Sequence, residues 1–131
     1  MVGMTISSFN WMKGKDEHII STLQSVFIDR NDPGRNDSVE IIVKWYGSNS
    51  KSKLVFKKSY LFKATMNFGI VANESIDDAY IAPPDDEDLT DFYKKWKGFF
   101  DQVKLHCYVI KTSSTGGEIK ILAEDVEMIE I

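Results

Sequence analysis

Glu118 and Lys120 form a Glu-x-Lys pair that follows a polar turn, and Asp101 lies upstream of them. Metal-dependent nucleases commonly use an Asp and a Glu-x-Lys strand to hold a magnesium ion and position a water molecule. Side chains two residues apart on a strand share one face, so Glu118 and Lys120 could act together. However, any strand with a solvated face carries such pairs, and Asp101 falls at the end of an expected helix. A metal-dependent nuclease is therefore the weakest of three functional hypotheses.

The nitrogen and sulfur side chains available to a transition metal are His18, His106 and Cys107. A zinc site needs three or four protein ligands. His106 and Cys107 are consecutive in an expected strand, so they point to opposite faces and do not share an ion. We therefore predict no metal and no cofactor, and we predict that Cys107 is a small buried apolar side chain.

Residues 74–91 carry eight acidic residues and no lysine or arginine, in a chain of net charge −4 and pI near 5.1. Affinity for nucleic acid depends on cationic contacts with phosphate, so this charge argues against nucleic acid and against an anionic membrane surface. An acidic surface would instead steer a basic protein partner. The same acids could also serve solubility and cap a helix. The predicted partner-binding residues are Asp77, Asp78, Asp85, Asp86, Glu87, Asp88 and Asp91.

Hydrophobic spacing predicts one long amphipathic helix over residues 88–103, because apolar side chains recur there with a period near 3.6 residues. Its apolar face is Leu89, Phe92, Tyr93, Trp96, Phe99, Phe100 and Val103. Such a broad aromatic face is expected to pack on a sheet.

The remaining chain predicts strands at 18–29, 38–46, 53–60, 76–82, 104–112, 118–123 and 125–131. Residues 61–68 either continue the strand before them past a bulge or form a further strand. Short turns between these segments favour antiparallel pairing. We therefore expect a single α+β domain over residues 1–131, with a curved, mainly antiparallel sheet of about six to eight strands and the long helix packed on it.

The predicted core lies between the helix and one face of the sheet. In the strand at 104–112, alternation places Leu105, Cys107 and Val109 on the core face, opposite Tyr108. The complete predicted core is Ile41, Val43, Leu54, Phe56, Phe92, Trp96, Phe99, Leu105, Cys107, Val109, Ile119 and Ile121.

The chain shows no secretory signal and no apolar run of the ~18 residues that span a bilayer, so the expected compartment is the cytoplasm. It resembles the small bacterial immunity proteins that accompany polymorphic toxins. The matching positions are an early Trp11 with Asp16 and His18, then the Leu54-Val55-Phe56 motif and Asn67, within residues 9–81. The resemblance implies a protein without catalysis that binds and blocks a cognate toxin.

The phosphate-binding and nucleophile motifs of common enzymes are absent from the sequence. We therefore expect a non-enzymatic protein–protein interaction module that binds a basic partner through its acidic residues. The alternative from another class is a small-molecule-binding domain that uses the concave sheet face under the helix. A final strand at 125–131 would also allow self-association if it lies at a sheet edge.

Overall fold

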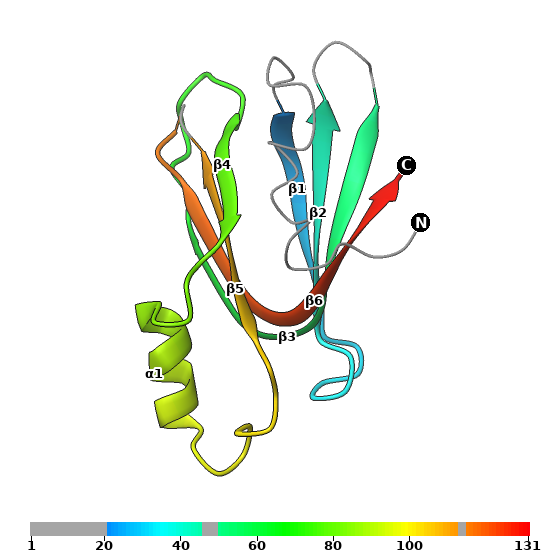
Figure 1. The fold of residues 1–131 in the computed structure, drawn as a ribbon. Helices are drawn as coiled ribbons and strands as arrows, with labels where there is room; N and C mark the ends of the chain where they lie inside the picture. The colour runs from blue at the N-terminus through cyan, green and yellow to red at the C-terminus, as the bar shows by residue number, and fades with distance from the viewer. Residues whose placement is uncertain (1–20, 46–49, 113–114) are drawn as a thin grey trace.

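The computed structural model describes residues 21–45, 50–112 and 115–131. In this part of the chain, six strands form one antiparallel sheet in the order β1-β2-β3-β6-β5-β4, with one helix (Figure 1). The elements are β1 (Ser21–Asp29), β2 (Ser38–Trp45), β3 (Lys51–Thr65), β4 (Ile76–Ile81), α1 (Glu87–Lys95), β5 (His106–Thr112) and β6 (Glu118–Glu130). The prediction of an α+β fold with a curved antiparallel sheet is confirmed. Among the described helices, none is long and apolar enough to cross a membrane.

β3 and β6 bend together, and this folds the sheet over on itself into two facing layers (Figure 1). The pairing of β3 with β6 shifts by one residue between Ser59 and Leu61, and Lys58 has a left-handed backbone with φ 52. A bulge beside a left-handed residue bends a strand and increases its twist. Residues 61–65 therefore continue β3 past a bulge, which is the first of the two predicted alternatives. β6 likewise runs through as one strand where two were predicted.

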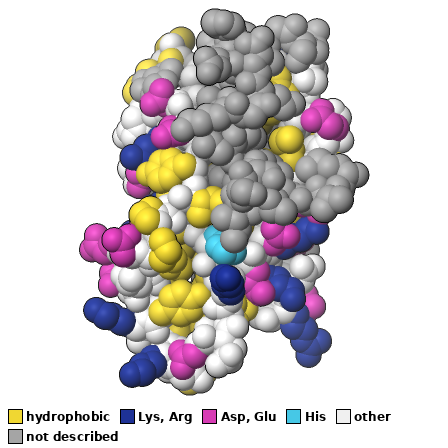
Figure 2. All heavy atoms as spheres, in the orientation of Figure 1, with side chains coloured by type: hydrophobic (Ala, Val, Ile, Leu, Met, Phe, Trp, Pro, Cys, Tyr) yellow, Lys and Arg dark blue, Asp and Glu magenta, His cyan; other side chains and the backbone are white. Residues whose placement is uncertain are grey.

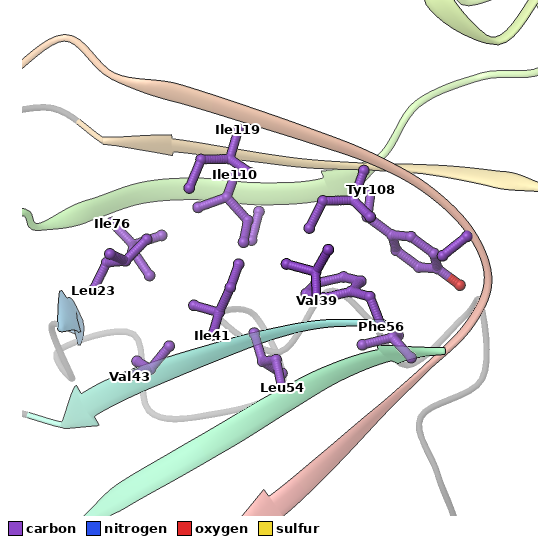
Figure 3. Close-up of a cluster of buried hydrophobic side chains, with 14 of the residues drawn as sticks. Leu23, Val39, Ile41, Val43, Leu54, Phe56, Ile76, Tyr108, Ile110 and Ile119 are labelled. Carbon is purple, nitrogen blue, oxygen red and sulfur yellow. The ribbon is translucent and has the colours of Figure 1, made fainter. Parts of the chain in front are cut away.

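The main core fills the space between the two layers (Figure 3). Ile41, Leu54 and Phe56 from one layer meet Tyr108 and Ile110 from the other, and all are at most 1% exposed. Burial of apolar surface on this scale is the main favourable term in folding. The prediction that Tyr108 faces away from the core is wrong, because β5 is covered on both of its faces.

α1 packs on the outer face of the second layer, where Leu89 and Phe92 contact a second buried cluster that includes Cys107, Val109 and Leu122. The helix covers the side of β5 and β6 that points away from the main core. The concave face of the sheet is therefore filled by side chains, and the helix lies on the convex side.

The prediction of one long helix over residues 88–103 is wrong, because α1 has nine residues and ends at Lys95. Gly98 follows with φ 90, and its N–H donates to both carboxylate oxygens of Asp101 at 3.1 Å. A left-handed glycine commonly ends a helix. The predictions that Trp96 and Phe99 lie in the core are also wrong, since these side chains are 40% and 77% exposed.

Candidate functional site

The seven predicted acidic residues do not form one surface. Asp77 and Asp78 lie at the start of β4, whereas residues 85–91 lie beyond its other end, around α1 (Figure 1). Figure 2 shows acidic side chains scattered among hydrophobic and basic ones on the displayed face. The exposed members of the set are Asp77, Asp78, Asp85, Glu87 and Asp91.

Asp86 and Asp88 are instead paired with lysines. Lys120 Nζ lies 2.8 Å from Asp86 Oδ1 and 2.6 Å from Asp88 Oδ2, and all three side chains are at most 20% exposed. Lys63 adds a contact of 2.8 Å to Asp88. Asp86 also caps α1, because it accepts the Leu89 N–H at 3.1 Å. These two carboxylates therefore dock the helix on the sheet.

The pKa shifts of this cluster follow from the pairing. Hydrogen bonds from Lys120 and then Lys63 lower the pKa of Asp88 against the effect of burial. Burial alone would raise the pKa of Asp86, but Lys120 and the Leu89 N–H outweigh it and lower that pKa. Burial disfavours the charged Lys120, yet its two carboxylate partners raise its pKa. All three groups are thus held in their charged forms at neutral pH.

The structure does not bring the proposed nuclease residues together. Lys120 is engaged by α1, the Glu118 carboxylate lies 3.9 Å from Lys111 Nζ, and Asp101 binds the Gly98 N–H. Within residues 21–45, 50–112 and 115–131, no group of three or more His, Cys, Asp or Glu side chains could hold a metal ion. Cys107 is fully buried, and burial together with nearby Asp86 raises the pKa of its thiol to about 12.

The strongest candidate for a site is a hollow that the sequence did not predict. It has a volume of about 490 Å³ and lies at the bend, between the β1–β2 turn and the end of α1. We call it the aromatic cleft. Its walls include Ile28, Tyr60, Leu61, Phe62, Phe92, Trp96 and Phe100.

Local irregularities position the aromatic side chains of this cleft. Tyr60 is the extra residue of the bulge in β3. The centroid of its ring lies 5.1 Å from that of Phe100 and 6.0 Å from that of Phe92, and both contacts are edge-on. Phe92 and Phe100 stack at 5.8 Å, and Trp96 lies 6.1 Å from Phe100. Bulges commonly redirect a side chain next to a functional site.

The loop after α1 is fixed by Tyr93, whose hydroxyl donates to the Val103 carbonyl at 2.6 Å and accepts the Leu105 N–H at 2.9 Å. This loop presents Phe100 to the cleft and leaves Phe99 outside it, 6.3 Å from the Trp96 ring. Trp96 and Phe99 therefore form an exposed aromatic lip beside the hollow. Gly98, whose left-handed backbone follows the helix end at Lys95, is a sequence signal that could have predicted this lip.

Charged groups surround the mouth of the cleft. Asp37 accepts a hydrogen bond from Arg30 Nε at 2.8 Å and another from the Gly34 N–H at 3.0 Å, and both contacts lower its pKa. Burial, and then the nearby Glu124 and Asp37 carboxylates, raise the pKa of Tyr60. The cleft thus combines aromatic walls with charged residues of both signs.

Comparisons with protein-family models, with curated proteins and with solved structures found no match for this chain. Trp11, Asp16 and His18, which carry the first part of the resemblance to immunity proteins, lie outside the described residues. Leu54 and Phe56 are buried core residues, and the Asn67 side chain donates to the Thr115 carbonyl at 2.6 Å in the connection to β6.

Proposed function

We propose that this protein is a non-catalytic module that binds a protein partner through the aromatic cleft and its lip. The observation that carries the proposal is the lip itself, where Trp96 is 40% and Phe99 is 77% exposed beside a hollow of about 490 Å³. Trp, Tyr and Arg are the residues that most often dominate binding energy at interfaces, and they concentrate around well-packed pockets. Tyr60, Arg30 and Arg35 line the same hollow.

The exposed acids have a secondary role in this proposal. Asp85, Glu87 and Asp91 lie on or just before the helix that ends at the lip, where they would steer a basic partner toward the cleft. An immunity-type protein that blocks a toxin is the more specific form of the proposal, and it rests on the sequence resemblance alone.

A small organic ligand is the second candidate, because about 490 Å³ falls within the range of roughly 300–1,000 Å³ that is typical of ligand pockets. The site for such a ligand would be the aromatic cleft and not the concave face of the sheet, which the core fills. A ligand held inside the cleft would not need Phe99, whereas a protein partner would cover it.

The proposal can be tested by site-specific photocrosslinking in the native host. A photoreactive phenylalanine analogue replaces Phe99 in one variant and Phe68 in the matched control. Both positions are strongly exposed, at 77% and 87%, but Phe68 follows β3 at the end of the sheet away from α1. Neither substitution should affect folding, since surface changes are usually neutral within ~0.5 kcal/mol.

We expect one protein to be captured at position 99 and not at position 68. Unlabelled wild-type chain should compete for it, and the additional substitution Trp96→Ala should abolish its capture. Capture of the same proteins at both positions, or capture that survives Trp96→Ala, would contradict the proposal.

A further inference from the structure

Two of the carboxylates that line the aromatic cleft, Asp29 and Glu124, make no ion pair with a residue that the structure describes. The charged residues that line it are Asp29, Arg30, Arg35, Asp37, Lys58 and Glu124. Asp37 is paired with Arg30, and Asp29 accepts the Asn31 N–H at 2.9 Å. Glu124 is partly buried and makes no ion pair with any residue that the structure describes.

Aromatic side chains line the cleft together with Glu124. Tyr60, Phe92, Phe100 and Trp96 contact one another with ring centroids 5.1 to 6.1 Å apart and at several different angles. Phe92 and Phe100 stack on each other, and Lys95 Nζ lies 5.7 Å from the centroid of the Trp96 ring, so this ring already contacts one cation of the chain. The face of an aromatic ring attracts a cation, most strongly for Trp, and sites that bind ammonium groups combine several such faces.

We propose that the aromatic cleft receives a lysine side chain of the protein partner, whose ammonium group lies between the aromatic rings and the Glu124 carboxylate. The inference rests on the proposed function and names the chemistry that the cleft recognises. The four-carbon stem of lysine would bury its methylene groups against Ile28 and Leu61 while its charged end reaches Glu124.

An anionic guest is the competing occupant, because Arg35 and Lys58 also line the cleft. Both are exposed, whereas Glu124 is partly buried. Exposed charges are screened by water and salt, and partly buried ones are screened much less. The charge of Glu124 is therefore screened less than the charges of Arg35 and Lys58.

The inference is tested by NMR titration of the full chain with four capped amino acids and with free tetramethylammonium. The capped amino acids are the Nα-acetyl methylamides of lysine, of side-chain-trimethylated lysine, of the neutral norleucine and of glutamate. The ring protons of Trp96 and Tyr60 report binding. We expect saturable shifts with both lysine probes and affinity at least about fivefold weaker for norleucine, since cation–π contacts and a partly buried ion pair are lost. Glu124→Gln should reduce this preference, and the control Glu118→Gln, on the same strand, should leave it unchanged.

Each other outcome overturns the inference. These outcomes are equal binding of norleucine and lysine, stronger binding of acetyl-glutamate methylamide, no saturable shift at the solubility limit, or an unaltered preference in Glu124→Gln. Tighter binding of free tetramethylammonium than of either lysine probe would assign the cleft to a free cation. If the lysine probe fails while position 99 still captures a partner, only this inference is wrong; if it binds while position 99 captures nothing, the proposed function fails.

Discussion

Lys120 connects the helix to the sheet through two ion pairs. It lies on β6, at the centre of the second layer, and reaches both Asp86 and Asp88 at the start of α1. In the sequence, this lysine was one half of a nuclease motif and the two acids were part of a binding surface. The structure shows that these opposite charges, which are far apart in the chain, form ion pairs with each other. Spacing along the chain could not predict this pairing.

Replacing Lys120 by Met should lower the free energy of unfolding by about 2–3 kcal/mol, because the partly buried Asp86 loses its lysine partner and Asp88 keeps only Lys63. Chemical denaturation at pH 7 measures the change. Lys111→Met is the matched control, since its ammonium lies 3.9 Å from Glu118 and both side chains are over 40% exposed, so it should cost less than about 0.5 kcal/mol. Equal effects of the two substitutions would show that Lys120 does not dock the helix.

The ion pairs of Lys120 with Asp86 and Asp88 also predict how the free energy of unfolding depends on pH. The pKa values of Asp86 and Asp88 are lower in the folded chain than in the unfolded chain, so their contribution is complete above pH ~4–5 and is lost as the pH falls through the folded values. Unfolding free energies measured from pH 6 to pH 3 should therefore decrease more steeply in the wild type than in Lys120→Met. Parallel profiles for the two chains would contradict the lowered pKa values.

At the scale of elements, the helix shows where hydrophobic periodicity misleads. The apolar spacing continues past Trp96 to Phe99, Phe100 and Val103, but Gly98 interrupts it with a left-handed backbone. Hydrophobic periodicity identifies the apolar face of a helix, but it does not identify the residue at which the helix ends. By contrast, β2 and β5 have nearly the predicted bounds, because their alternating side chains lie between clear turn signals.

The substitution Gly98→Ala distinguishes a helix that ends at Lys95 from a continuous helix over residues 88–103. The two structures predict opposite signs for its effect on stability. At φ 90 an alanine is strained although nothing lies within 4 Å of its Cβ, so the chain should lose about 1 kcal/mol of stability. In a continuous helix over residues 88–103, the same substitution would stabilise the chain by about 1 kcal/mol. Thermal or chemical denaturation of the variant and wild type decides between them.

At the scale of the whole molecule, the bend in β3 and β6 produces both the core and the cleft. It brings two layers face to face around Phe56 and Tyr108, and it leaves Tyr60 on the other side, toward α1. The sequence predicted the strands and their antiparallel class but not this folding over. A bulge at Tyr60 and the left-handed backbone of Lys58 lie at the bend, and the sequence offered the bulge only as one of two alternatives.

Two aromatic substitutions test where the core lies. Phe56→Ala should cost about 3–5 kcal/mol, since Phe56 is fully buried between the layers. Trp96→Ala should cost about 1 kcal/mol, because much of its ring already faces water. The two midpoints of chemical denaturation give the comparison, and an equal or larger loss for Trp96→Ala would place the core under the helix, as the sequence first predicted.

The most direct test of the aromatic cleft is the environment of Trp96 in a complex. The chain has three tryptophans, so 5-fluorotryptophan labelling gives three ¹⁹F signals, which single substitutions assign. Trp45 is 4% exposed and serves as the internal reference. On saturation with the protein captured at position 99, the Trp96 signal should shift and lose its sensitivity to exchange of H₂O for D₂O, while the Trp45 signal stays unchanged. A saturated complex in which Trp96 remains as exposed to solvent as in the free chain would contradict the account.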